Sequence, residues 1–297
     1  MFPIRDHNPS MRVPFITWAL IAANIVVFLM YFPELSSNPR ALFAFYGEWA
    51  LVPAEVSTGL ERQTLLTSMF LHGGWLHLIM NMLFLYIFGD NIEDQLGHIG
   101  FLIFYLAAGV AAAYAQVWAD ASSTVPVVGA SGAIAGVMGG YLLLFPRARV
   151  DILVILVVIF RIFTIPAWIV LGLWFALQLV NGAASGAAGG GVAYWAHAGG
   201  FIAGVALLLP LWLRRGGPDY WTQTHGAPPH AETRPTGAAA GRDQFADGPI
   251  RSYSRESTVP APIRRDLQSS RIPSAGRRRP AETESQGTTP RGPWSGN

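Results

Sequence analysis

The chain has 297 residues, of which 52% are hydrophobic and only 13% are charged, whereas ordinary soluble domains are about one quarter charged. This composition indicates a membrane protein, and the absence of cysteine excludes disulfides, thiolate metal sites and a cysteine nucleophile. The charge is uneven, because residues 214–297 hold thirteen arginines and eight acidic residues, whereas residues 1–213 hold seven arginines and ten acidic residues.

The first apolar run, 14–32, follows Arg5 and Arg12. It is longer than the apolar core of a signal peptide, which has about 7–15 residues, and no small-residue cleavage site follows it. The run therefore predicts a transmembrane helix that is retained.

Six segments approach the roughly 20 apolar residues that a transmembrane helix needs. The second and fourth are short and carry polar or small residues, so we expect the other helices to enclose them. The predicted fold is an all-α membrane protein with a six-helix transmembrane bundle. The six segments are 14–32, 76–88, 101–118, 131–145, 165–180 and 192–213.

The connections between these segments differ in character. Residues 33–70 mix proline, glycine, aromatic and charged residues, so we expect short interfacial helices there, outside the membrane. Residues 89–100 predict an acidic loop between the second and third spans. Residues 152–163 form another apolar run, with Arg161 inside it and Pro166 just beyond. We interpret this run as a re-entrant or interfacial segment, with one long tilted helix as the alternative.

Arginines predict the orientation, because cytoplasmic loops of membrane proteins are enriched in basic residues. With six spans, the three pairs of arginines that flank spans all fall on one side of the membrane, which should be the cytoplasmic side. We therefore expect a cytoplasmic N-terminus over 1–13, a membrane domain over 14–213, and a cytoplasmic tail over 214–297. The tail is rich in proline, glycine and arginine and poor in aliphatic residues, so we expect it to be disordered. The three groups are Arg5 and Arg12, Arg147 and Arg149, and Arg214 and Arg215.

Strongly polar side chains inside membrane spans are rare and tend to mark functional sites. His77 and Asn81 are four residues apart in the second span, so they share a helix face. Ser131 opens the fourth span, and His197 lies in the first part of the sixth span. Because successive spans alternate in direction, these four side chains should lie at a similar depth below the outer surface.

Small residues at four-residue spacing follow both Ser131 and His197. Such a pattern lets two helices approach closely inside lipid. We therefore expect the fourth and sixth spans to pack glycine against glycine, which brings the Ser131 hydroxyl within hydrogen-bond reach of the His197 ring. The glycines are Gly132, Gly136 and Gly140 in the fourth span, and Gly200 and Gly204 in the sixth.

These groups indicate a serine hydrolase. A serine hydroxyl becomes nucleophilic when a base takes its proton, and the neutral imidazole of His197 suits this role near pH 7. Asn81, His77 and the Ser131 backbone N–H are candidate oxyanion donors. A transporter or channel that uses the same polar groups remains an equal alternative on the residues alone. A metal site is disfavoured because His72 and His77 are five apart with no carboxylate beside them, and zinc needs three or four ligands.

Three motifs, in this order, resemble those of the rhomboid intramembrane serine proteases. Each is modest alone, but their combination on the right spans is specific, and the resemblance covers residues 14–213. The motifs are His72-x4-His77-x3-Asn81, Gly129-Ala130-Ser131-Gly132 and Ala196-His197-x2-Gly200-x3-Gly204.

The resemblance implies a catalytic dyad of Ser131 as nucleophile and His197 as general base, with no acidic partner and no cofactor. It implies an oxyanion hole formed by Asn81, His77 and the Ser131 backbone, and a structural or gating role for His72. The glycines that would support this site are Gly129, Gly132, Gly200 and Gly204.

The sequence departs from the family pattern at two places. Gln63-Thr64 stand where many members have Trp-Arg in the first outer loop, and Ala135 stands where many have an aromatic residue one turn after the serine. We expect either that another ring stacks on the histidine instead or that the imidazole is held less firmly. The candidates for this ring are Tyr194, Trp195 and Phe201.

The resemblance also implies a substrate and a route for it. Members cleave transmembrane helices of other membrane proteins near the membrane surface, so the expected partners are single-pass membrane proteins and the lipid bilayer, with no nucleic acid. Bulky residues of the fifth span, Trp168, Trp174 and Phe175, form a hypothetical lateral gate. The expected location is a bacterial inner membrane, and the main rival is an inactive relative that binds membrane helices.

Overall fold

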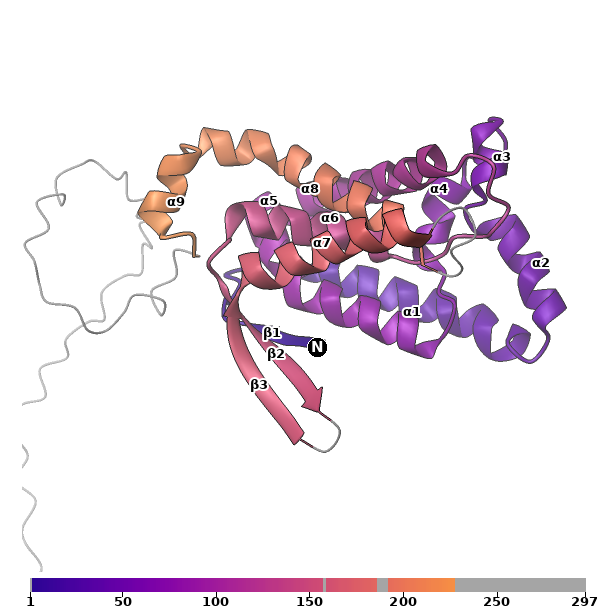
Figure 1. Cartoon of the computed structure of the whole chain (residues 1–297), viewed down its shortest axis with the longest axis horizontal. Coiled ribbons are helices and arrows are strands. Elements are labelled where there is room, and N and C mark those ends of the chain that lie inside the picture. The colour runs from indigo at the N-terminus through magenta and orange to yellow at the C-terminus, as the bar shows by residue number, and fades with distance from the viewer. Residues whose placement is uncertain (1, 157–158, 186–191, 228–297) are drawn as a thin grey trace, which may run out of the picture. The chain divides into compact units, whose positions relative to one another are not determined.

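The computed structural model describes residues 2–156, 159–185 and 192–227, so the predicted tail from residue 228 onward lies outside the described residues. Figure 1 shows the described part as a set of long helices with a small sheet. The elements are β1 (Phe2–Asp6), α1 (Phe15–Leu35), α2 (Pro39–Trp49), α3 (Pro53–Ser57), α4 (Thr64–Thr67), the 3-10 helix η1 (Ser68–Phe70), α5 (Trp75–Ala119), α6 (Ser131–Leu144), β2 (Arg149–Leu156), β3 (Ile159–Pro166), α7 (Ala167–Ser185), α8 (Tyr194–Arg214) and α9 (Pro218–Thr224).

The expectation of several apolar membrane helices is confirmed. Within the described residues, α1, α5, α7 and α8 are long and apolar enough to cross a membrane, and α6 is a shorter apolar helix. The 45 residues of α5 form two helices, because Gly97 has a left-handed backbone with φ of 71°. Residues 75–96 and 98–119 are therefore two helical segments joined at a kink.

The predicted acidic loop over 89–100 is wrong, because α5 continues through it on both sides of Gly97. Of the three acidic residues in this stretch, Asp90, Glu93 and Asp94, Glu93 is buried. Its carboxylate accepts hydrogen bonds from the backbone N–H of Ile16 at 2.9 Å and from the backbone N–H and the hydroxyl of Thr17 at 2.8 and 2.7 Å. A carboxylate at a helix N-terminus satisfies free N–H donors and complements the helix dipole. Glu93 thus anchors the start of α1 to α5.

The alternative of one long tilted helix over 152–163 is wrong, because this run lies mostly in two strands, whereas a re-entrant or interfacial position stays a prediction. The all-α class is correct in part, because the described residues are mostly helical but include one small sheet. β2 and β3 form an antiparallel hairpin, and β1 pairs antiparallel with β2, so the sheet order is β1-β2-β3. The run is rich in isoleucine, valine and phenylalanine, which favour strands. Asp151 on β2 ties the sheet together, because it accepts hydrogen bonds from Arg5 and Thr164 and bonds the His7 ring.

A buried acid fixes the end of β1 to the helices. The Asp6 carboxylate accepts hydrogen bonds from the Tyr141 hydroxyl at 2.8 Å and the Asn91 side-chain amide at 3.0 Å. Burial raises the pKa of Asp6 from 3.8 to about 7, in spite of these two donors and with a smaller contribution from the nearby Asp90. The protonation state of Asp6 therefore bears on how firmly the N-terminal strand is held.

The predicted disordered tail begins too early. Residues Pro218–Thr224 form α9, within the segment 214–297 that composition assigned to disorder. Trp221 explains this helix, because its ring packs on Trp212 with centroids 4.8 Å apart and its indole N–H donates to the Leu143 carbonyl at 2.8 Å. These aromatic contacts attach the first turns of the tail to the ends of α6 and α8.

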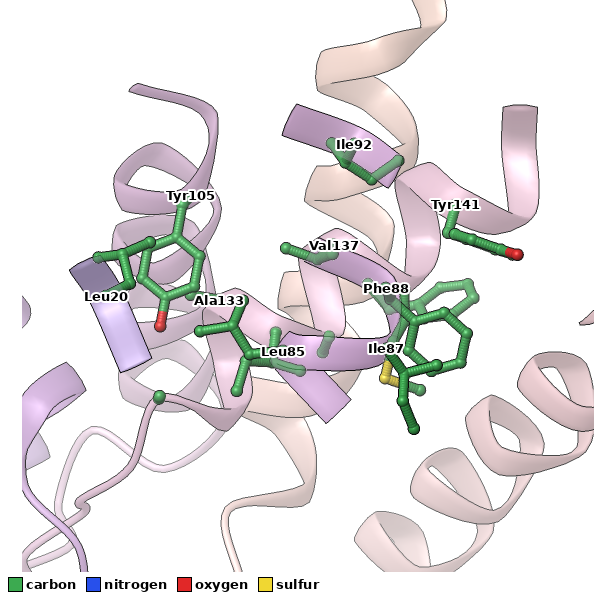
Figure 2. Packing of buried hydrophobic residues seen from close by; sticks show 14 of the residues in the cluster. Leu20, Leu85, Ile87, Phe88, Ile92, Tyr105, Ala133, Val137 and Tyr141 are labelled. Carbon is green, nitrogen blue, oxygen red and sulfur yellow. The ribbon is translucent and has the colours of Figure 1, made fainter. Parts of the chain in front are cut away.

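The core forms around α6, as expected for a short span enclosed by others. Figure 2 shows Leu20 of α1, Phe88 and Tyr105 of the two parts of α5, and Val137 and Tyr141 of α6 in one buried cluster. Along α6, every residue from 132 to 141 is buried. The helix that begins at Ser131 is therefore held on all sides by protein.

Glycines set the distance between α6 and α8. A Cβ atom placed on Gly200 would lie 2.0 Å from the Gly132 carbonyl oxygen, and one on Gly204 would lie 1.9 Å from the Gly136 carbonyl oxygen. Only residues without a side chain permit this approach. The expected glycine-against-glycine packing of these two helices is confirmed.

The short helices and the sheet occupy opposite ends of the long helices. Figure 1 shows α2, α3 and α4 near the start of α6, and the sheet and α9 near its end. The segment before α6 is tied to the first loop, because Leu51 and Val127 exchange backbone hydrogen bonds and the Gly129 N–H donates to the Ser68 carbonyl. The predicted short helices of residues 33–70 are confirmed, and they surround the start of the helix that carries Ser131.

Candidate active site

Ser131 and His197 are in direct contact. The Ser131 Oγ lies 2.7 Å from His197 Nε2, a hydrogen bond of good length. Ser131 is the first residue of α6, and His197 lies in the first turn of α8. The side-chain amide of Gln116 on α5 supports this end of α8, because its oxygen accepts a hydrogen bond from the Ala196 N–H at 3.1 Å. Close helix packing thus produces the predicted pair.

Helix α7 supplies two further contacts to the His197 ring. Gln178 Oε1 lies 2.9 Å from His197 Nδ1, the nitrogen that faces away from Ser131. The Trp174 ring lies over the imidazole, with centroids 5.8 Å apart and an interplanar angle of 33°. The imidazole is therefore held at both nitrogens and on one face.

His77 on α5 faces the same point as the serine. The Gly73 N–H donates to His77 Nδ1 at 3.3 Å, which leaves Nε2 as the protonated nitrogen of the neutral ring. A Cβ placed on Gly129 would lie 2.9 Å from His77 Nε2 and 3.4 Å from Ser131 Oγ. Gly129 also has φ of +133°, so glycine is required there for both backbone and space. The His77 ring and the serine hydroxyl therefore both lie beside Gly129 and line the same cavity.

Asn81 provides an unused donor beside this group. Its side chain is buried, and its Nδ2 has no hydrogen-bond partner among the residues that the structure describes. It lines the same cavity as His77, Ser131 and His197, with a volume of about 700 Å³. A buried amide without a partner is unfavourable by about 1–3 kcal/mol, so it is normally explained by a ligand, water or a catalytic role.

His72 lies behind the site and not in its cavity. Its ring is fully buried and packs edge-on against His77, with centroids 5.1 Å apart, and against Phe28. Its backbone carbonyl accepts hydrogen bonds from the hydroxyls of Tyr31 at 2.7 Å and Tyr46 at 3.0 Å. Burial, assisted by the neighbouring His77, lowers the pKa of His72 to about 3, so the ring is neutral. These contacts agree with a supporting position for His72.

The three residues of the hypothetical gate have different surroundings on α7. Trp168 is 55% exposed, whereas Phe175 stacks on Phe201 of α8 with centroids 4.5 Å apart. Trp174 lines the cavity and contacts His197, so it belongs to the site itself. Gating by these residues remains a prediction.

The structure shows the surroundings of both departures from the family pattern. Thr64 is buried and its hydroxyl donates to the Glu61 carbonyl at 2.6 Å, while Gln63 also bonds the Glu61 side chain. Ala135 is buried inside α6, and the ring over His197 comes from Trp174. The three candidate rings were therefore the wrong choice: Tyr194, Trp195 and Phe201.

Sequence reasoning missed the contacts of Gln178 and Trp174 with His197. Gln178 did carry a signal, because it is a strongly polar residue inside an apolar span. The two residues are four positions apart, so they lie on one face of α7. No group of three His, Asp or Glu side chains that could hold a metal ion occurs in the described ranges.

Comparison with known proteins identifies the family. The model of the Rhomboid domain matches residues 60–214, just over half of the chain, and this range contains Ser131, His197, His77 and Asn81. The chain belongs to the rhomboid family. It is therefore a mostly helical, multi-pass membrane protein of that family.

Curated relatives agree with this assignment. The chain is 29% identical over 196 residues to rhomboid protein 1, mitochondrial, of Saccharomyces cerevisiae, a match that covers 64% of this chain and 51% of the relative. It is 34% identical over 204 residues to the rhomboid protease GluP of Bacillus subtilis, covering 66% and 36%. It is 28% identical over 169 residues to RHOMBOID-like protein 5 of Arabidopsis thaliana, covering 47% and 55%. The chain spans about half or less of the length of these relatives.

Proposed function

We propose that this rhomboid protein is an intramembrane serine endopeptidase, with Ser131 as nucleophile and His197 as general base. The 2.7 Å contact between Ser131 Oγ and His197 Nε2 is the observation that carries the proposal. A serine hydroxyl held on an imidazole nitrogen, beside a cavity with unused donors, is the arrangement that acyl transfer needs. One relative, the rhomboid protease GluP, is named as a protease, and its match covers 66% of this chain.

The reaction follows from the directions of these hydrogen bonds. His197 Nε2 accepts the Ser131 proton while Oγ attacks the carbonyl carbon of the scissile peptide bond. The tetrahedral intermediate collapses when the C–N bond breaks, and the imidazolium gives its proton to the leaving amine. Water then attacks the acyl-enzyme, with His197 again as base, and releases the acid and the free Ser131 hydroxyl.

The negative charge of the tetrahedral intermediate develops on the former carbonyl oxygen, so hydrogen-bond donors must lie next to that oxygen. Asn81 Nδ2 is buried and has no partner among the described residues, and the His77 ring lines the same cavity as Ser131, beside Gly129. The Ser131 N–H lies in the first turn of α6, where backbone donors are not used by the helix. The positive end of the α6 dipole adds to their effect. We assign the oxyanion hole to these three donors.

We further propose that six helical segments cross the membrane: α1, the two parts of α5, α6, α7 and α8. The arginines 5, 12, 147, 149, 214 and 215 then share one side, which we assign to the cytoplasm of a bacterial cell. The site lies at the other end of α6 and opens outward. Its substrates would be single-pass membrane proteins, cut near the outer surface of the inner membrane.

A cleavage assay in liposomes tests the proposal. The substrate is a single-pass protein with small residues near the outer end of its helix, and the variants are Ser131→Ala and His197→Ala. Ser122→Ala is the matched control, because Ser122 is an exposed loop serine that bonds only Asp120 in the described structure. A fluorophosphonate that labels active serines measures the nucleophile independently of substrate choice.

Loss of cleavage and of labelling in both site variants, with activity retained in the Ser122 control, is the expected result. Cleavage that survives Ser131→Ala would refute the mechanism. A folded protein that neither cleaves nor labels would favour an inactive member that binds membrane helices.

A further inference from the structure

We infer that Gln178 is a positioning residue for the general base, and that it stands where an acid would stand in a Ser-His-Asp triad. This inference rests on the proposed protease function. The motifs that identify the family do not include Gln178, and it comes from α7, a helix separate from those that carry the serine and the histidine.

The orientation of the Gln178 amide follows from its second contact. Gln178 Nε2 donates to the backbone carbonyl of Trp174 at 3.2 Å, and a carbonyl only accepts hydrogen bonds. The nitrogen of the amide must therefore face Trp174, and the oxygen must face His197 Nδ1 at 2.9 Å. An amide rotated by 180° would place its oxygen against the Trp174 carbonyl oxygen, which puts two acceptors in contact.

This orientation sets the tautomer of His197. Because Gln178 Oε1 only accepts, the proton of the neutral imidazole sits on Nδ1. The lone pair of Nε2 then faces the Ser131 hydroxyl, which donates across 2.7 Å. The hydrogen bonds run in one direction from Ser131 through His197 and Gln178 to the Trp174 carbonyl. The base is thus held in the form that can remove the serine proton.

A neutral acceptor suits this location better than a carboxylate. Gln178 is 8% exposed on a helix otherwise lined by apolar, largely exposed side chains. A buried, unpaired carboxylate would carry a desolvation penalty of several kcal/mol, whereas an amide satisfied at both ends does not. An amide fixes the tautomer and the ring angle while adding no charge inside the membrane.

Trp174 is the second residue of α7 that contacts His197. Its ring covers one face of the imidazole, and it lies one turn before Gln178 on the same side of α7. Both contacts with His197 therefore depend on the position of α7. Of the described residues of α7, only Ala167, Leu171, Gln178 and Gly182 are buried, so this helix is held less firmly than α6.

The test compares three substitutions at one position in the full chain in liposomes. Gln178→Leu removes the acceptor at similar size, Gln178→Asn withdraws it by about one C–C bond, and Gln178→Glu keeps an oxygen in place. Gln95→Leu is the matched control, because Gln95 also accepts a partly buried hydrogen bond, from Arg215, but at the far end of the helices. Thermal unfolding shows which variants fold.

We expect kcat to fall about 100-fold in Gln178→Leu and Gln178→Asn, the loss typical of a catalytic group misplaced by about 1 Å. KM should stay within about twofold, because Gln178 does not line the cavity. Labelling of Ser131 by the fluorophosphonate should slow in parallel. Gln178→Glu should keep most of kcat, because a carboxyl group buried here is neutral: its O–H donates to the Trp174 carbonyl and its other oxygen accepts from His197 Nδ1–H. Gln95→Leu should also keep kcat.

Two results would overturn the inference: kcat unchanged in both folded Leu and Asn variants, or a loss that Gln178→Glu does not recover and that Gln95→Leu reproduces. The first would show that His197 needs no partner at Nδ1, and the second that the loss is one of general stability. Failure of the proposed function is a different outcome, in which the unmodified protein and Ser131→Ala behave alike.

Discussion

The replacement of Gly204 by alanine tests whether the contact between α6 and α8 sets the geometry of the site. The new Cβ would lie 1.9 Å from the Gly136 carbonyl oxygen, 2.5 Å from its carbon and 2.6 Å from its Cα. All three atoms belong to the backbone, so none can rotate away. An ordinary contact begins at 3.4 Å, so the two helices must separate by roughly 1.5 Å at this level.

That separation is enough to break the hydrogen bond between Ser131 and His197. Gly204 lies two turns beyond His197 on α8, and Gly136 lies on α6 after Ser131. A displacement of about 1.5 Å would lengthen the 2.7 Å contact to about 4 Å, beyond any hydrogen bond. We expect kcat/KM to fall about 100-fold and the free energy of unfolding to fall by about 1–3 kcal/mol.

The assay is cleavage of the liposome substrate together with thermal unfolding. Gly172→Ala is the matched control, because Gly172 is also inside a helix and a Cβ there meets nothing within 4 Å. It should keep activity and gain about 0.5–1 kcal/mol of stability, since alanine is favoured over glycine in helices. If Gly204→Ala cleaves as fast as the unmodified protein and unfolds at the same temperature, the close packing does not set the site.

Three further predictions concern single side chains. Asn81→Ala should lower kcat about 100-fold with little change in unfolding temperature, measured in the same assay, and an unchanged kcat would remove Asn81 from the oxyanion hole. Phe175→Ala should raise turnover of an embedded substrate by loosening α7 from α8, whereas Trp174→Ala should lower it through His197; a rise in both would favour a pure gate. Asp6→Asn tests a pH dependence of stability. Because burial raises the pKa of Asp6 in the folded state to about 7, the folded state binds this proton more tightly than the unfolded state. The stability of the unmodified protein should therefore decline as pH rises from about 4 to about 7. Unfolding temperatures across this range should show the decline in the unmodified protein and lose it in Asp6→Asn, and equal slopes would contradict it.

The membrane helices and the contact between Ser131 and His197 were predictable because their signals are local. Apolar length predicts a span, and four-residue glycine spacing predicts a close helix face without reference to the rest of the chain. Once α6 and α8 are known to pack through Gly132 and Gly200, the positions of Ser131 and His197 at the start of each helix place them together.

The sheet was not predictable from the same signals. The apolar run 152–163 has a length that fits a strand pair or a helix, and hydrophobicity alone does not distinguish them. The decisive partner lies far away in the sequence, because β1 pairs Phe2 with Leu153 and Asp6 with Val150. The prediction of a loop in the acidic stretch before Gly97 was wrong for a related reason. The hydrogen-bond partners of Glu93 lie at the start of α1, far away in the sequence.

Gln178 and Trp174 show a third limit. Their spacing places both on one face of α7, but the neighbour of that face depends on how α7 is rotated against α8. No sequence spacing defines this rotation. The structure resolves it through the contacts of Gln178 with His197 Nδ1 and of Phe175 with Phe201.

The three helices that meet at His197 are held to different degrees, and this difference bears on how the protein would control its reaction. Close backbone packing at Gly132 and Gly136 fixes the spacing between α6 and α8, and with it the distance between the serine and the histidine. Helix α7, which is mostly exposed, holds only the orientation and tautomer of the histidine through Gln178. A substrate helix that displaced α7 would therefore leave the dyad distance intact and release the base from its partner. Activity would then depend on α7 returning to its position, which makes this helix the adjustable part of the site.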